Sequence, residues 1–269
     1  MNELLKNIES MKIRGANRIA IEGLKFLRKF CKEKGFGRDF QKTTEKLESV
    51  RPTAVVLHNC LEILKKERDV ETINKLLRQL REAPKRIAKH GSKLIKSGYS
   101  IMAHCHSTEA LEIIKEAWEE KKKIKVYATE TEPRLQGIIT AKELAKKKIP
   151  VILIVDSAIE FFIKDVDMVL VGTDAMRKEG VVNKIGTCTM AVVAKKHKVP
   201  FYVAGNTLKL DNRKKFVIEE RDPDEVYVEH MKTLEVRNPA FDITPWKYVK
   251  RVITEKGIMT PGNVLKMIK

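Results

Sequence analysis

The sequence predicts a two-part protein of the α/β class, in which a helical bundle is followed by a parallel sheet with helices on both faces. Residues 1–95 carry helical periods of apolar residues. From Gly98 onward, short apolar runs alternate with amphipathic stretches at the spacing of β-α-β units. The 269 residues, 43% of them hydrophobic, are enough for a sizeable core. We therefore expect an N-terminal helical domain at residues 1–95 and a C-terminal α/β domain at residues 96–269.

The N-terminal part is expected to consist of amphipathic helices. The stretch ANRIAIEGLKFLRKFCKEKG places four apolar residues on one helical face, and these are Ala20, Leu24, Leu27 and Cys31. Gly35 follows at a position where glycine commonly ends a helix. A second helical stretch begins after Pro52 and includes residues 61–64, and a third covers residues 72–90. Pro84 predicts either a break in this third helix or the start of a new one.

The C-terminal part alternates between expected strands and expected helices. Five short apolar runs predict strands, at residues 99–104, 124–129, 150–155, 166–172 and 200–204. Amphipathic stretches between them predict helices, at residues 107–120, 140–148, 157–164 and 185–197. After Lys209 the chain becomes irregular, with one late strand expected at residues 248–254.

Polar and reactive side chains follow the ends of the expected strands. They are His104-Cys105-His106, Thr129-Glu130, Asp156-Ser157, Thr173-Asp174 and Gly205-Asn206. In an open α/β sheet, ligands bind beyond the carboxyl ends of the strands. Each group alone has a structural explanation, but their common edge predicts a functional site.

Cys105 is the candidate nucleophile or base of this edge. It precedes Ser107, a residue type that caps helix N-termini, and a thiol near such a terminus has a lowered pKa. Protonated His104 and His106 would lower the thiol pKa further, so we expect Cys105 to react faster than the other cysteines. An inert structural cysteine is the alternative. A metal site is a weaker alternative, because three consecutive residues cannot easily converge on one ion.

Asp174 is the candidate acid. An aspartate at the end of an apolar strand is expected to be pushed towards its protonated form by burial, ready to donate a proton. The structural alternative is that Asp174 caps a following turn. Asp156 precedes an expected helix, and we interpret it as structural.

Three groups of residues are candidates for binding an anion. Asn183 and Lys184 offer an amide and an ammonium where a helix is expected to open. Arg14 stands beside Gly15, which permits close approach of the backbone to a ligand, and Arg51 stands at another expected helix start. Surface charge is the alternative for each of them. No P-loop and no GxGxxG motif occurs, so nucleotide binding by those routes is not supported.

The net charge of +18 is spread along the chain, with lysine and arginine interleaved with glutamate. Together with only three glutamines, this pattern indicates heat adaptation through surface ion pairs rather than a nucleic-acid partner. The four cysteines, at positions 31, 60, 105 and 188, are scattered as in a reduced protein. Without an apolar run of about 20 residues or a signal peptide, we expect a cytoplasmic protein that makes no use of a membrane.

Eight motifs occur in the order found in one superfamily of proteins. They are IRGANRIA, RPTAV, HCHS, TETEPRLQG, VDSA, GTDAM…EGVVNKIGT, PFYVAGNTLKL and NPAFDITP. Through these motifs nearly the whole chain resembles the superfamily of ribose 1,5-bisphosphate isomerase, methylthioribose-1-phosphate isomerase and the alpha, beta and delta regulatory subunits of the translation initiation guanine-nucleotide exchange factor. It looks like an archaeal member. The resemblance implies a helical N-terminal domain and a Rossmann-like C-terminal domain.

The resemblance also implies roles for individual residues. In the isomerases a cysteine and an aspartate stand where Cys105 and Asp174 stand, which implies that these two are the catalytic base and acid. The implied substrate contacts, mostly to phosphate and sugar hydroxyls, are Arg14, Gly15, Ala16, Arg51, Gln136, Asn183, Lys184 and Lys209. No metal and no nucleotide cofactor is implied.

Two main functions follow from the resemblance, and a third alternative is some other member that binds a sugar phosphate or a nucleotide. The first is an aldose–ketose isomerase that acts on a C1-phosphorylated ribose, and the retention of Cys105 and Asp174 favours it. The second is a non-catalytic protein, similar to the regulatory subunits, that binds a translation initiation factor and a phosphorylated sugar or nucleotide. Departures from the ribose bisphosphate enzymes favour the second, at Asn17, Thr108 and Asn206. For both functions we expect a homodimer or an assembly of dimers.

Overall fold

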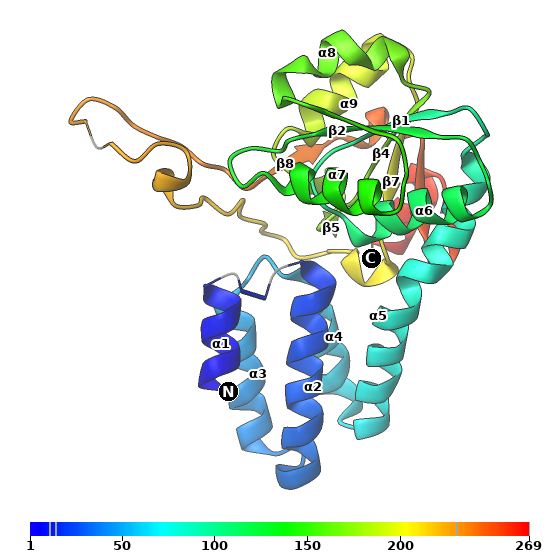
Figure 1. The fold of residues 1–269 in the computed structure, drawn as a ribbon. Helices are drawn as coiled ribbons and strands as arrows, with labels where there is room; N and C mark the ends of the chain where they lie inside the picture. The colour runs from blue at the N-terminus through cyan, green and yellow to red at the C-terminus, as the bar shows by residue number, and fades with distance from the viewer. Residues whose placement is uncertain (11, 14, 230, 269) are drawn as a thin grey trace. The chain divides into compact units, whose positions relative to one another are not determined.

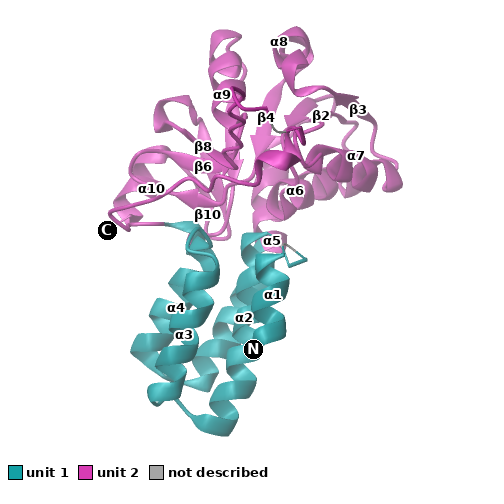
Figure 2. Cartoon of the chain, turned by 90° about the vertical axis from the view of Figure 1, so that its left-hand side faces the viewer, with its two compact units in different colours: residues 1–83, 208–210 teal, residues 84–207, 211–269 magenta. Residues whose placement is uncertain are grey.

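The computed structural model describes residues 1–10, 12–13, 15–229 and 231–268. The chain forms two compact units, one of residues 1–83 with 208–210 and the other of residues 84–207 with 211–269 (Figure 2). The division falls inside helix α5 (Val70–Gly91), whereas the sequence places the domain boundary after residue 95. The helix continues through Pro84, so the predicted break there is wrong. Proline removes one hydrogen-bond donor, and the rest of this long helix is retained.

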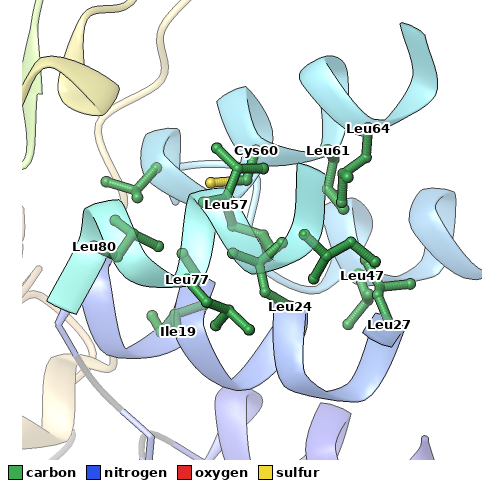
Figure 3. Close-up of a cluster of buried hydrophobic side chains, with 14 of the residues drawn as sticks. Ile19, Leu24, Leu27, Leu47, Leu57, Cys60, Leu61, Leu64, Leu77 and Leu80 are labelled. Atoms are coloured by element: carbon green, nitrogen blue, oxygen red, sulfur yellow. The ribbon is translucent and has the colours of Figure 1, made fainter. Parts of the chain in front are cut away.

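The first unit is a bundle of amphipathic helices, as the sequence predicts. Its helices are α1 (Asn2–Glu9), α2 (Ala16–Lys34), α3 (Arg38–Val50), α4 (Val55–Glu67) and the first part of α5. The predicted apolar face of α2 is buried, and Leu24 and Leu27 pack with Leu57 and Leu61 of α4 (Figure 3). Gly35 follows the end of α2 with φ of 69°, a conformation that glycine adopts without steric cost.

The second unit is built on a seven-stranded sheet in the order β10-β9-β7-β4-β1-β2-β3. Its strands are β1 (Ser100–Ala103), β2 (Lys125–Thr129), β3 (Val151–Ile154), β4 (Met168–Val171), β7 (Phe201–Ala204), β9 (Arg251–Thr254) and β10 (Gly257–Met259). All neighbouring pairs are parallel except β9 with β10. The prediction of a mostly parallel sheet is therefore confirmed, and each of the six expected strands is present.

Helices cover both faces of this sheet (Figure 1). Helices α6 (Thr108–Glu119) and α7 (Gln136–Lys146) lie on one face, and α8 (Ile159–Phe162) and α9 (Thr187–Lys196) lie on the other. Ser107 caps α6 as expected, because its hydroxyl accepts a hydrogen bond from the Ala110 N–H. The expected helix at residues 157–164 is reduced to the single turn α8 between two short 3-10 turns. A last helix, α10 (Pro261–Met267), ends the unit.

A second, three-stranded antiparallel sheet was not predicted from the sequence. It consists of β5 (Ala175–Met176), β6 (Val181–Lys184) and β8 (Phe241–Thr244). Asn183 and Lys184 therefore end a strand and do not open a helix. Helix α9 begins only at Thr187, after Gly186 turns the chain with φ of 96°. The expected helix start was wrong because Asn183 and Lys184 pair with Asp242 and Phe241 of β8, which lies far along the chain.

Among the described residues, no helix is long and apolar enough to cross a membrane.

Candidate functional site

Cys105 follows β1 in an unusual backbone conformation. Its φ of 67° lies in the left-handed region, which costs energy for a residue with a side chain. Two threonines fix this conformation. The Cys105 N–H donates to Thr131 Oγ1 at 2.9 Å, and Thr140 Oγ1 donates to the Cys105 carbonyl at 2.8 Å. The surrounding chain thus holds Cys105 in one orientation at the carboxyl end of the sheet.

His104 connects the end of β1 to the end of β6. Its ring is buried, and Nε2 donates to the Ile185 carbonyl at 2.8 Å, since a carbonyl oxygen can only accept. Nδ1 lies 2.7 Å from Thr129 Oγ1. Burial lowers the pKa of His104, which keeps the imidazole neutral. The expectation that a protonated His104 lowers the thiol pKa is therefore wrong, and with both ring nitrogens engaged His104 is not placed as a metal ligand.

Strand β6 ends in Lys184 and pairs with the backbone of Asp174. The Asp174 N–H donates to the Val182 carbonyl at 2.8 Å, which places the half-buried aspartate beside β6. Lys184 ends the strand with its side chain buried and its ammonium 5.8 Å from the ring centre of Phe241. The charge of Asp174 raises the pKa of both Cys105 and Lys184, although burial has the larger effect on each.

Burial raises the pKa of the Cys105 thiol to about 11. The Lys184 charge and the His106 N–H act in the opposite direction but do not overcome the loss of hydration. The predicted lowering of the thiol pKa is therefore wrong. At pH 7 a thiol with this pKa is ionised in roughly one molecule in 10⁴. Burial also lowers the pKa of Lys184, and the charge of Arg221 lowers it further.

The N-terminus of α9 is occupied by a carboxylate of the chain itself. Asp242 Oδ2 accepts hydrogen bonds from the N–H groups of Gly186 at 2.8 Å and Cys188 at 3.0 Å. Burial nevertheless raises the pKa of Asp242 to about 6. The Asn183 amide donates to Thr187 Oγ1 at 3.0 Å. Asp242 therefore caps the helix end at which the sequence predicts an anion, and ligand binding by Asn183 and Lys184 stays a prediction.

Gln136 is the first residue of α7, and its Oε1 is buried with no hydrogen-bond partner among the residues that the structure describes. A buried acceptor of this kind is costly unless a ligand or water satisfies it. Helix α7 approaches the end of β2 so closely that a Cβ on Gly137 would lie 1.6 Å from the Thr129 carbonyl oxygen. Gln136 is thereby fixed close to a strand end.

The remaining predicted contacts belong to the first unit. Gly15 precedes α2 with φ of 88°, Ala16 begins that helix, and Arg51 follows α3. Lys209 is buried between Leu208 and Leu210, whose carbonyls accept hydrogen bonds from the Asn59 amide at 2.8 and 2.7 Å. Arg14 lies outside the described residues. Ligand binding by these five residues stays a prediction.

Other charged residues have structural roles. Asp156 accepts the N–H groups of Thr131 at 2.9 Å and Glu132 at 2.8 Å, in agreement with its structural interpretation. Within the described ranges, one cluster has potential metal ligands close together, and it consists of Glu48, His58 and Glu62 in the first unit. Its two carboxylates already bind Lys65, at 3.1 and 2.8 Å.

Two residues near the site, Glu219 and Arg221, were not predicted from the sequence. The side chain of Arg221 is 7% exposed, and its Nε lies 3.4 Å from Glu219 Oε1. The charge of Arg221 acts on both Cys105 and Lys184. The motif EERDP carries no strand or helix period that would mark its arginine for burial, and only the pairing of this segment with residues 238–240 reveals it.

Known proteins share this fold and much of this sequence. A ribose 1,5-bisphosphate isomerase of Methanocaldococcus jannaschii is 41% identical over 100% of this chain and 94% of its own length. A methylthioribose-1-phosphate isomerase of Acetivibrio thermocellus is 35% identical over 96% of this chain and 88% of its own. The crystal structure of translation initiation factor eIF-2B from Pyrococcus horikoshii OT3 matches with a TM-score of 0.87 and 32% identity, covering 98% of both chains. The model of the Initiation factor 2 subunit family matches residues 12–261, and the chain belongs to this family.

Proposed function

We propose that this chain is an aldose–ketose isomerase that acts on a ribose phosphorylated at C1, such as ribose 1,5-bisphosphate. The observation that supports the proposal is that the backbone of Asp174 pairs with Val182 of β6, while His104, the neighbour of Cys105, binds Ile185 just after the Lys184 end of that strand. Archaeal relatives that are 37–42% identical over nearly the whole chain and carry the name ribose 1,5-bisphosphate isomerase support it.

The reaction requires both an acid and a base. A phosphate on the anomeric oxygen prevents spontaneous ring opening, because no free hemiacetal exists. Asp174 donates a proton to the ring oxygen as its bond to C1 breaks, and Cys105 removes the proton from C2. The resulting enol becomes the ketose when a proton is returned to C1 and the C2 hydroxyl loses its own. Each well-placed proton transfer contributes about 10²–10⁴-fold to the rate.

The raised thiol pKa is compatible with this chemistry when the two groups are treated as one unit. The working form, thiolate with carboxylic acid, contains the same number of protons as the form with thiol and carboxylate. The equilibrium between these forms does not depend on pH as long as the pair holds a single proton. The charge of Asp174 raises the thiol pKa, so the two groups interact electrostatically.

The pH dependence of kcat/KM is expected to report on Lys184. Its ammonium is the form that binds phosphate, and its pKa is lowered by burial, so kcat/KM should fall as the pH rises through this lowered pKa. Arginine stays charged throughout this range. We therefore expect Lys184→Arg to move the alkaline decline in kcat/KM to higher pH, towards the thiol pKa of about 11. An unchanged alkaline decline in a variant with wild-type thermal stability would exclude Lys184 as its origin.

The second candidate is a regulatory subunit without catalytic activity that binds protein partners. The match to the eIF-2B structure over 98% of both chains favours it, because that protein is named as a translation initiation factor. A homodimer or an assembly of dimers remains our expectation for either function.

A turnover assay on the wild-type protein separates the two candidates. Ribose 1,5-bisphosphate and methylthioribose 1-phosphate are the substrates to compare, with calorimetry under the same conditions. The isomerase proposal predicts conversion of the first substrate to its ketose. Binding without turnover would favour the regulatory candidate. The absence of both binding and turnover would contradict the proposed site itself.

A further inference from the structure

Residues 219–221 form a short ladder next to the site. The Ala240 N–H donates to the Glu219 carbonyl at 2.8 Å, and the Arg221 N–H donates to the Asn238 carbonyl at 2.9 Å. Residues 238–240 lead directly into β8, and the Ala240 carbonyl accepts from the Ile185 N–H at 3.1 Å. Backbone hydrogen bonds thus connect the ladder to the end of β6, where Lys184 lies.

Alternation along the ladder directs its charged side chains to opposite sides. Glu220 points outwards and binds Arg237, whose side chain is 68% exposed, at 3.1 Å. In an extended segment the residues on either side of Glu220 point the other way. Arg221 is accordingly buried, with a side-chain exposure of 7%, and lies 3.4 Å from Glu219. Its charge lowers the pKa of both Cys105 and Lys184, which agrees with a guanidinium directed towards the site.

Two buried cations therefore act on the same thiol. A guanidinium near a second buried cation is unfavourable unless an anion compensates both charges. Asp174 and Glu219 supply negative charge in this environment. A phosphate dianion is also favoured beside two cations, and the planar guanidinium fits phosphate oxygens through two parallel hydrogen bonds.

We infer that Arg221, together with Lys184, binds the phosphate at C1 of the substrate. The assignment to C1 rests on the proposed function, in which Cys105 and Asp174 act at C2 and at the ring oxygen attached to C1. The phosphate on C1 is the nearest anion to those atoms, and a phosphate at the other end of the sugar is several bonds farther away.

The first test measures phosphate binding without turnover. Inorganic phosphate is expected to protect Cys105 of the wild-type protein from iodoacetamide during long incubations at neutral pH, measured by mass spectrometry. Arg221→Gln should raise the half-protecting phosphate concentration about 10-fold or more, because one charge-assisted pair is lost. Arg237→Gln is the matched control, since it removes an exposed guanidinium that binds Glu220 of the same ladder, and it should behave as the wild type.

The second test uses the sugar phosphates. Ribose 1-phosphate should protect Cys105 less well in Arg221→Gln than in the wild type, while any protection by ribose 5-phosphate should change less. Arg221→Lys, which keeps the charge but not the planar fork, should give an intermediate effect and replaces Arg221→Gln if that variant does not fold. Equal protection in the wild type and the Arg221 variants, or no protection of the wild type by any phosphate, would overturn the inference. Protection that depends on Arg221 in a protein without turnover would retain the phosphate site and reject only the isomerase proposal.

Discussion

Replacement of Cys105 by alanine is expected to lower kcat for ribose 1,5-bisphosphate by about 10²–10⁴-fold, the contribution of one well-placed proton transfer. The thiol is the group at the end of β1 that removes the C2 proton in our proposal. Alanine keeps the backbone N–H and carbonyl that bind Thr131 and Thr140, so the loop should be retained. Steady-state kinetics measure kcat of the variant, and a thermal melt checks that it is folded as stably as the wild type.

Cys188→Ala is the matched control for this variant. Cys188 resembles Cys105 in being partly exposed, but it lies in α9, where its backbone N–H donates a hydrogen bond to Asp242. Its replacement should leave kcat within about 3-fold of the wild type, because our proposal gives Cys188 no part in proton transfer. Similar losses in both variants would indicate a general disturbance of the sheet edge and not the loss of a base.

Replacement of Asp174 by asparagine is expected to lower kcat by at least about 10²-fold. Asparagine keeps the size of the side chain and the N–H that binds Val182, but it cannot donate a carboxyl proton. A rise in KM with kcat unchanged would show that Asp174 contributes to binding and not to proton transfer.

The same variant has a second readout that needs no turnover. The carboxylate charge of Asp174 raises the pKa of the Cys105 thiol, so Asp174→Asn should lower that pKa. Alkylation of Cys105 should then reach half of its maximal rate at a lower pH than in the wild type. An unchanged midpoint would mean that the two groups do not interact as the structure indicates.

The large sheet was predictable because its strands are short runs of buried apolar residues. Strand β4, for example, is Met168–Val171, and all four residues are buried. The small sheet was not predictable. Strand β5 has two residues, and β6 ends in Asn183 and Lys184, so neither shows an apolar period. Their pairing with β8 depends on residues far along the chain, which local patterns do not reveal.

The candidate site shows the same limit. The position of Cys105 and Asp174 at strand ends follows from the alternation of strands and helices. The thiol pKa does not, because burial outweighs the nearby helix start, and burial depends on the whole fold. Likewise, Asp242 caps α9 from a strand that begins 54 residues after the helix start at Thr187, so the sequence alone left that helix end open for a ligand.

The most direct test of the account is a cycle of Cys105→Ala, Asp174→Asn and the double variant, measured as kcat for ribose 1,5-bisphosphate. If the two residues exchange protons with one substrate as a single unit, removing the second after the first should cost little more. We predict that kcat of the double variant lies within about 10-fold of the slower single variant. Losses that multiply, or single variants as active as the wild type, would contradict the proposal that Cys105 and Asp174 form one catalytic site.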